Sequence, residues 1–255
     1  MRTRPGIELA GLSDVGCCRQ NNEDRYSYWE PDTDALFWRK GRLALVADGM
    51  GGYEGGQEAS RIAAEAIEDV YASVPDGDID ASLLAAFQEA HRRIRSYASH
   101  HVELNSMGTT CTAVVLAGRQ LHYAHVGDSR LYLVRDGKIS RLTHDHSYVG
   151  RLIEQGVLRP EEGESHPQRH ILTAALGAGN EIVPDIPVEP VSIKKGDILV
   201  LCTDGLWGLL SDKEICAMVA EKKPAEACHE LVQMAKDRGA PDNITVQVIR
   251  ITGAR

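Results

Sequence analysis

Residues 43–60 read LALVADGMGGYEGGQEAS, and this stretch decides the fold class. Its first five residues are all apolar, which predicts a buried strand, and a glycine-rich turn follows. Beyond the turn, Ile62, Ala66, Ile67 and Val70 share one face of a predicted helix. We therefore expect a buried sheet that is covered by helices.

Further elements follow on both sides of this stretch. A second long helix is predicted over residues 82–99, and a third over 224–238. Asp136-Gly137 is a strong hairpin signal. Strands are predicted at residues 7–12, 25–28, 110–116, 120–126, 130–135, 139–142, 198–202 and 244–251. Long helices in pairs and hairpin-length turns favour an α+β fold with antiparallel sheets over a doubly wound parallel sheet.

Composition and charge limit the possible functions. The chain has 255 residues, a net charge of −9 and no repeat or linker-like segment, so we expect one domain over residues 1–255. An acidic chain of this kind predicts no nucleic-acid or anionic-membrane partner. No apolar run approaches the ~20 residues of a membrane span. The basic N-terminus lacks an apolar signal-peptide core, and six cysteines without a CxxC pair suit a reducing compartment. We therefore expect a cytoplasmic monomer.

Carboxylates at strand ends are the most informative local pattern. Asp48, Asp128 and Asp204 each close an apolar strand and precede Gly or Ser, and Asp242 stands just before another strand. Carboxylates that meet at one rim of a sheet repel one another and favour a cation, and hard oxygen ligands select Mg²⁺ or Mn²⁺ over Zn²⁺. Any single Asp-Gly is more often a turn. The pattern alone therefore leaves a shared metal site and a set of ordinary turns as comparable alternatives.

Several other chemistries are disfavoured by the sequence. No cysteine is followed six residues later by Arg, so the C-x5-R loop of cysteine phosphatases is missing, and no G-x4-G-K-[ST] phosphate loop occurs. Two histidine pairs, His122/His125 and His144/His146, leave a structural zinc site as a minor alternative, because no cysteine pair has zinc spacing.

A series of ordered segments resembles one family. The segments are RQNNED at 19–24, DGMGGYEGG at 48–56, MGTT at 107–110, VGDSRLYLVRDG at 126–137, THDHSYV at 143–149, LCTDGLW at 201–207 and PDNIT at 241–245. They are similar to the motifs of the type 2C (PPM) metal-dependent Ser/Thr protein phosphatases, most of all the stand-alone bacterial members that oppose Hanks-type Ser/Thr kinases. The resemblance runs over nearly the whole chain.

This resemblance implies a fold and a set of roles. The implied fold is an α-β-β-α sandwich of two antiparallel β-sheets flanked by helices, with a flap insertion at about 144–176. Asp48 would bridge two Mn²⁺ or Mg²⁺ ions and Gly49 would offer its carbonyl, while Asp204 and Asp242 complete the protein ligands of one ion. A third ion would lie at Asp128 with Asp204. Glu23 would hold a metal-bound water with support from Asp24, and Arg19 would bind the substrate phosphate.

The implied reaction is hydrolysis of phosphoserine and phosphothreonine in proteins by a metal-activated water. The implied partners are phosphorylated proteins, including a Ser/Thr kinase. A catalytically silent phosphoprotein-binding module on the same fold is the alternative, but such a member should have lost metal carboxylates, and Asp48, Asp204 and Asp242 are present. Without the motifs, Arg19 would be read as a surface ion pair with Glu23 or Asp24.

Two departures from the family pattern concern the substrate side. Met50 stands where many eukaryotic relatives have a histidine that is considered for the general acid, and a thioether cannot donate a proton. The acid must then be a metal-bound water or another group. Ala174 stands where many bacterial relatives have an arginine, which leaves the contacts to substrate beside the flap open.

Overall fold

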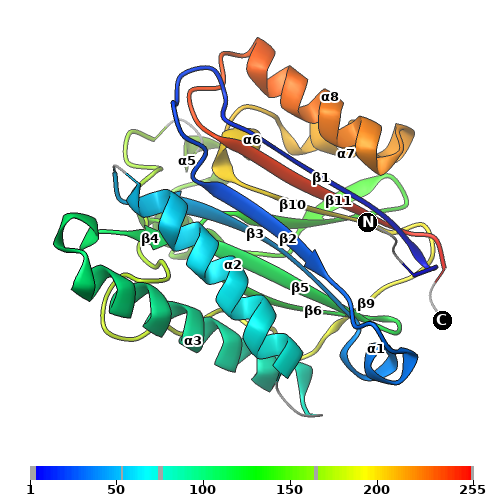
Figure 1. Ribbon diagram of the computed structural model, residues 1–255. Coiled ribbons are helices and arrows are strands. Elements are labelled where there is room, and N and C mark those ends of the chain that lie inside the picture. The colour runs from blue at the N-terminus through cyan, green and yellow to red at the C-terminus, as the bar shows by residue number, and fades with distance from the viewer. Residues whose placement is uncertain (1–3, 53, 74–76, 164–165, 254–255) are drawn as a thin grey trace.

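The chain folds into two antiparallel sheets that pack face to face between two layers of helices (Figure 1). The computed structural model describes residues 4–52, 54–73, 77–163 and 166–253. The predicted α+β sandwich is confirmed. No helix in these ranges is long and apolar enough to cross a membrane.

Each sheet is named here after a central strand. The β3 sheet has the order β2 (Asp24–Trp29), β3 (Arg42–Met50), β5 (Cys111–Ala117), β6 (Gln120–Val126) and β9 (Val191–Ser192), and the short β4 (Gly108–Thr109) pairs with the end of β3. The β10 sheet has the order β1 (Ile7–Asp14), β11 (Ile244–Ile251), β10 (Ile198–Cys202), β7 (Arg130–Arg135) and β8 (Lys138–Arg141).

The long helices lie on the outer faces of the sheets. Figure 1 shows α2 (Gly55–Ser73) and α3 (Ile79–His100) over the β3 sheet, and α7 (Asp212–Glu221) and α8 (Pro224–Asp237) over the β10 sheet. Short helices complete the described chain: α1 (Asp34–Lys40), a 3₁₀ turn (Val102–Leu104), α4 (Tyr148–Glu154), α5 (Pro160–Gly163) and α6 (Asp204–Trp207).

Three apolar layers hold the sandwich together. Along β3, Leu43 and Leu45 face α2 and α3, whereas Ala44 and Val46 face the other sheet. Because both faces of this strand are buried, its sequence is continuously apolar rather than alternating. The strands of the β10 sheet also divide their side chains between the inter-sheet core and the layer under α7 and α8.

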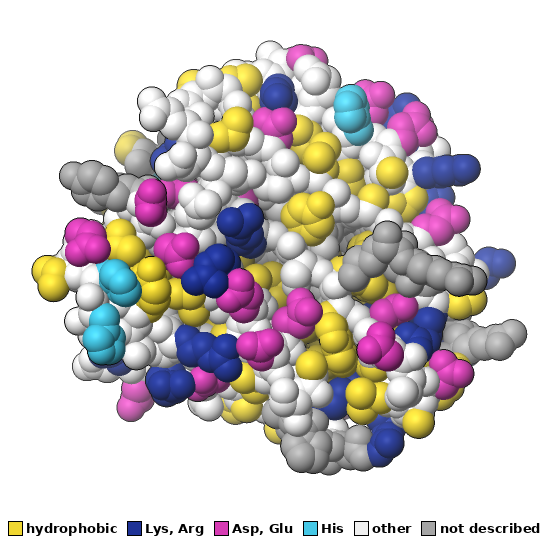
Figure 2. All heavy atoms as spheres, in the orientation of Figure 1, with side chains coloured by type: hydrophobic (Ala, Val, Ile, Leu, Met, Phe, Trp, Pro, Cys, Tyr) yellow, Lys and Arg dark blue, Asp and Glu magenta, His cyan; other side chains and the backbone are white. Residues whose placement is uncertain are grey.

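Local turn chemistry follows the sequence closely in one hairpin. Asp136 and Gly137 between β7 and β8 have φ of 53° and 74°, as a two-residue turn of type I′ requires. The outer surface in the view of Figure 2 carries acidic and basic side chains side by side, without a large patch of one sign.

Candidate metal centre

Five aspartates from both sheets meet in one acidic cluster. Asp24 and Asp48 come from the β3 sheet, and Asp204 and Asp242 lie next to strands of the β10 sheet. Asp128 lies in the loop from β6 to β7, where the chain passes from one sheet to the other. Burial raises the pKa of Asp48 well above its usual value, and the negative charges of the other four aspartates raise it further. The strand-end pattern therefore identifies groups that the fold brings together.

Strand pairing fixes the first two carboxylates. Asp24 and Asp48 are directly opposite in the β2–β3 ladder, so their side chains are neighbours across the strands. The backbone of Asp48 is held on its other side, since its N–H donates to Thr110 Oγ1 at 3.0 Å and its carbonyl accepts from Thr110 N–H at 2.9 Å. The strand continues through Asp48 to Met50, three residues beyond the apolar run at 43–47 that the sequence predicts as a strand.

Glycine is required where the backbone beside Asp48 meets the start of α2. A side chain on Gly49 would lie 2.0 Å from the carbonyl oxygen of Gly56. A side chain on Gly56 would lie 2.8 Å from the Glu23 carboxylate. The glycine-rich stretch after β3 therefore allows Glu23 and the Gly49 backbone to approach each other.

A second close backbone contact joins the two carboxylates of the β10 sheet. Asp204 is the first residue of α6, and the next residue, Gly205, packs so tightly that a Cβ would lie 1.9 Å from the Asn243 carbonyl oxygen. The Asn243 N–H in turn donates to Asp242 Oδ1 at 2.8 Å. Asp204 and Asp242 are thus held side by side by the backbone around them.

Asn243 also organises the loop that carries Arg19 and Glu23. Its Oδ1 accepts from Glu23 N–H at 2.8 Å, and its Nδ2 donates to the carbonyls of Val15 and Asn21 at 2.9 and 3.0 Å. This role is not predictable from the sequence, because the partners are about 220 residues away along the chain and no local pattern marks them.

Arg19 lies at the acidic cluster, where it pairs with a carboxylate other than Glu23 or Asp24. Its Nη2 donates to Asp242 Oδ2 at 2.8 Å, so the alternative of a surface ion pair with Glu23 or Asp24 is not what the structure shows. Burial works against the charged form, but the charge of Asp242 and a hydrogen bond to it raise the pKa of Arg19 overall. Half of the side chain stays exposed, which leaves it accessible to an anion.

Asp24 is the most deeply buried carboxylate of the set. Its Oδ2 accepts from Thr203 Oγ1 at 2.8 Å, whereas its Oδ1 is buried and has no hydrogen-bond partner among the described residues. Burial raises the pKa of Asp24 to about 7, with smaller contributions from the charges of Asp204 and Asp242, against hydrogen bonds from Thr245 and Thr203 that lower it. An unpartnered buried carboxylate oxygen indicates that a positive charge or a donor is needed here.

The donor set fits a hard divalent cation. Carboxylate oxygens dominate, and such ligands suit Mg²⁺ or Mn²⁺. Among the residues that the structure describes, no group of three His, Cys, Asp or Glu side chains is placed so that it could hold a metal ion as it stands. Two side chains with nitrogen donors lie against the carboxylates instead: Arg19 at Asp242, and His170, whose Nδ1 is 3.6 Å from Asp204 Oδ2.

Three of the four histidines that suggested zinc, His122, His125 and His146, have other side-chain partners. His122 Nδ1 lies 2.8 Å from Asp80 Oδ1, and His125 is hydrogen-bonded through Thr112 Oγ1 and the carbonyl of His144. Burial lowers the pKa of His125 to about 4, aided by the nearby His146. These are structural histidines in the described chain.

The segment at 144–176 begins and ends on the sandwich. An isolated bridge joins Leu176 to Thr109, another joins Ser147 to Leu172 within the segment, and the described residues of the segment include the helices α4 and α5. His170 of this segment reaches Asp204, as described above. The segment therefore lies beside the acidic cluster.

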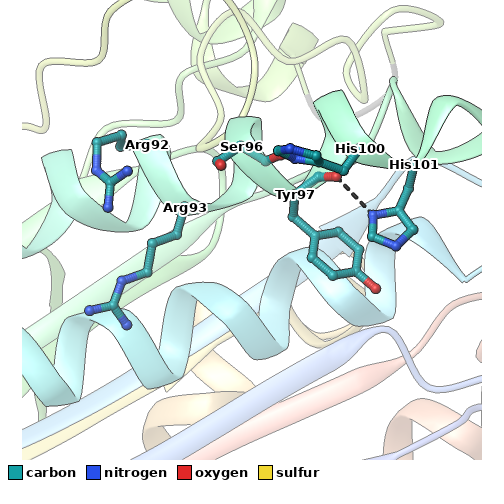
Figure 3. Close-up of a pocket in the computed structure, with 6 residues that line it drawn as sticks. All are labelled: Arg92, Arg93, Ser96, Tyr97, His100 and His101. Atoms are coloured by element: carbon teal, nitrogen blue, oxygen red, sulfur yellow. Dashed lines mark hydrogen bonds between the residues drawn. The ribbon is translucent and has the colours of Figure 1, made fainter.

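A separate shallow pocket on α3 is no rival to this site. Figure 3 shows its lining by Arg92, Arg93, Ser96, Tyr97, His100 and His101, all on or next to one helix, with His101 Nδ1 bonded to the Tyr97 carbonyl. Arg92 and Arg93 are already paired with Glu89, and Arg93 also with Asp69.

Comparisons with known proteins agree with this geometry. Residues 19–245 match the model of the protein phosphatase 2C family. The chain is 37% identical over 242 residues to the serine/threonine protein phosphatase PstP of Mycobacterium tuberculosis, covering 95% of this chain and 44% of that one. It is 34% identical to the protein phosphatase PhpP of Streptococcus pneumoniae, covering 95% of this chain and 97% of that one.

Solved structures show the same similarity in three dimensions. The crystal structure of Mycobacterium tuberculosis PstP superposes with a TM-score of 0.86 at 36% identity, over 97% of this chain and 99% of that chain. The PstP catalytic domain in complex with two manganese ions gives 0.83 at 34% identity, over 97% and 99%. The chain belongs to the protein phosphatase 2C family. It spans less than half the length of the mycobacterial PstP that it matches.

Proposed function

We propose that this protein is a protein-serine/threonine phosphatase that hydrolyses phosphoserine and phosphothreonine in phosphorylated proteins, with two Mn²⁺ or Mg²⁺ ions as cofactors. The observation that carries the proposal is the acidic cluster itself. Aspartates from both sheets lie close enough to Asp48 for their charges to raise its pKa, and the half-exposed Arg19 lies beside them. Family membership and the two manganese ions of the PstP complex support it.

The proposed roles follow from position. Asp48 is influenced by all four other aspartates and would bridge the two ions, with the Gly49 carbonyl as a further ligand. Asp204 and Asp242 would bind one of the two ions. The close contact of Gly205 with Asn243 holds these two aspartates near each other. Asp128 with Asp204 would hold a third ion. Glu23 lies across from Gly56 and would bind a metal-coordinated water, with Asp24 behind it.

When bound, two such ions activate a water and neutralise charge on the phosphoryl oxygens. The chain itself supplies binding and orientation. Arg19 presents a permanently charged guanidinium that can donate two parallel hydrogen bonds to the phosphate oxygens. The segment at 144–176 reaches Asp204 through His170, and we expect it to limit access of water and substrate from that side. No cysteine takes part, since Cys111, Cys202, Cys216 and Cys228 are buried and Cys17 and Cys18 lack the C-x5-R loop.

The silent-module alternative is disfavoured by the donors that remain. A binding module would need Arg19 but not the buried carboxylates, whose mutual repulsion costs stability. Retention of Asp48, Asp204 and Asp242 in one cluster supports catalysis.

The deciding experiment is hydrolysis of a phosphothreonine peptide with Mn²⁺ and with EDTA. We expect Mn²⁺-dependent turnover that Asp204→Asn reduces by about 10²–10³-fold, the order expected when a group that stabilises transition-state charge is removed. The matched control is Asp32→Asn, an exposed carboxylate before α1. Turnover that survives EDTA, or an Asp204→Asn variant as active as Asp32→Asn, would refute the metal site.

We further propose that the chain is one phosphatase domain with a flap at 144–176, that it acts as a monomer in the cytoplasm, and that a Hanks-type Ser/Thr kinase is among its partners. Four buried free thiols support a reducing compartment. Size-exclusion chromatography with light scattering tests the monomer, and dephosphorylation of an autophosphorylated kinase tests the partner.

A further inference from the structure

Trp207 holds the backbone of Asp128. Its indole Nε1–H donates to the Asp128 carbonyl oxygen at 2.9 Å. Trp207 is the last residue of α6, the four-residue helix that begins at Asp204. One short rigid element therefore carries the Asp204 carboxylate at one end and holds the Asp128 loop with the other.

Arg130 connects this indole to the base of the flap. Its guanidinium carbon lies 3.6 Å from the centre of the Trp207 ring, a close cation–π contact. The same guanidinium donates to both oxygens of Asp145, at 3.1 and 2.7 Å. Arg130 and Asp145 are largely buried, with 16% and 12% of their side chains exposed, so this fork is little screened by solvent.

The residue after Asp145 holds the other side of the Asp128 loop. The His146 N–H donates to the Gly127 carbonyl at 2.7 Å, and the Gly127 N–H donates to His146 Nδ1 at 3.2 Å. The peptide units around Asp128 are thus bound by the flap base on one side and by Trp207 on the other.

We propose that Trp207, Arg130 and Asp145 form a positioning relay that fixes Asp128 against Asp204 and couples this pair to the base of the flap. None of the three touches the reacting atoms. The part of the proposal that concerns a cation at Asp128 rests on the proposed function. Because coupling between two sites is reciprocal, a cation at Asp128 and Asp204 should order the base of the flap around Asp145 and His146. Loosening this base should in turn weaken the binding of that cation.

The first test is Trp207→Phe in the full chain, which keeps an aromatic ring under Arg130 but removes the N–H that holds Asp128. Calorimetric titration with Mn²⁺ should show about five- to tenfold weaker binding of the weakest ion, as expected for one lost hydrogen bond, with the tighter ions unchanged. Amide hydrogen exchange over residues 146–153 should be faster. Trp38→Phe is the matched control, since Trp38 is 60% exposed on α1.

The second test is Asp145→Asn, alone and combined with Trp207→Phe. Asn keeps the size of the side chain and loses the charge that Arg130 binds. In a relay the double variant should be little worse than the single ones, whereas independent packing defects would add. Full additivity, or normal flap exchange and ion affinity in both single variants, would overturn the relay.

Both readouts are independent of turnover. If the wild-type chain binds only two ions, exchange over residues 146–153 decides alone, and an unchanged rate in Trp207→Phe would overturn the proposal. If the chain binds Mn²⁺ as described but hydrolyses no phosphopeptide, the proposed function fails while the relay stands.

Discussion

Arg19 lies where a substrate phosphate, if it binds as proposed, would compete with the Asp242 carboxylate for one guanidinium. It bonds to Asp242 at 2.8 Å while half of its side chain is exposed. A phosphate carries more charge than the carboxylate and can accept both arms of the fork. The same residue can therefore screen the acidic cluster in the free protein and bind substrate in the complex.

Replacement of this guanidinium tests the second role. We expect Arg19→Ala to lower kcat/KM for a phosphothreonine peptide about ten- to hundredfold, the value of one or two charge-assisted hydrogen bonds, mainly through a higher KM. Inorganic phosphate should also inhibit the variant less. Arg92→Ala, on the remote face of α3, is the control. If KM and phosphate inhibition are unchanged, Arg19 does not bind the substrate phosphate and serves only as the ion-pair partner of Asp242.

Asp24 makes stability depend on pH in the metal-free protein. Its pKa is raised from 3.8 to about 7, mainly by burial, so the folded state holds a proton that the unfolded state has lost. Between about pH 4 and 7 the folded state binds more protons, and the free energy of unfolding falls as pH rises. The contribution of Asp24 is most favourable below pH 4 and is lost above pH 7.

We therefore expect the melting temperature in EDTA to fall by several degrees from pH 5 to pH 8, and the stabilisation by Mn²⁺ to grow over the same range, because the cation binds the ionised carboxylates. Asp24→Asn should flatten the EDTA profile. The measurement is a thermal melt at each pH with and without Mn²⁺. A slope that Asp24→Asn leaves intact would assign the titration to another group.

The tight packing of α6 against the start of β11 lies next to both Asp204 and Asp242, so it is placed to control their spacing. We expect Gly205→Ala to destabilise the protein by about 1–3 kcal/mol, the range for an overpacked site, and to weaken Mn²⁺ binding, because a Cβ there would lie 1.9 Å from the Asn243 oxygen. Gly253→Ala, with no atom within 4 Å of its Cβ position, is the control. Melting and Mn²⁺ titration measure both effects; normal Mn²⁺ affinity would mean that the contact does not set the site.

Strong periodic elements were predictable and short ones were not. The bounds of β6, β7, β10 and β11 agree with the sequence to the residue, because each is a short run rich in aliphatic and aromatic residues between turn residues. The helices α1, α5 and α6 and the strands β4 and β9 were missed. They span two to seven residues, too few for a period to show, and tertiary contacts stabilise them.

The same distinction applies to the site. A strand-end pattern identified Asp48, Asp128, Asp204 and Asp242 from residue type and spacing. Glu23, Asp24 and Arg19 came only from the family resemblance, since nothing local distinguishes them from a polar loop. Asn243 and Trp207 received no role at all, because their partners lie far away along the chain.

Over the molecule as a whole, the six thiols fall into an exposed class and a buried class. Cys17 and Cys18 are exposed, and the other four are buried. Burial raises the pKa of Cys228 to about 12, so its thiolate is scarce at neutral pH. We expect two thiols per chain to react rapidly with Ellman's reagent in the folded protein and six in denaturant. Cys17→Ser should leave one fast thiol, and more than two fast thiols would contradict the packing of the helical layers.

The acidic cluster also lies where the two halves of the sandwich meet. Asp24 belongs to the β3 sheet, yet its carboxylate bonds Thr203 at the end of β10. Each sheet has its own helical layer and its own apolar core, joined by the inter-sheet layer between them. Repulsion among the ionised aspartates favours separation of the two sheets at this end of the molecule. A divalent cation bound between the carboxylates replaces that repulsion with attraction. The ion thereby acts as a cross-link as well as a cofactor. With the ion bound, the two halves should unfold in one cooperative transition, with equal van't Hoff and calorimetric enthalpies. Without it, the van't Hoff enthalpy should fall below the calorimetric enthalpy, because the halves begin to unfold separately.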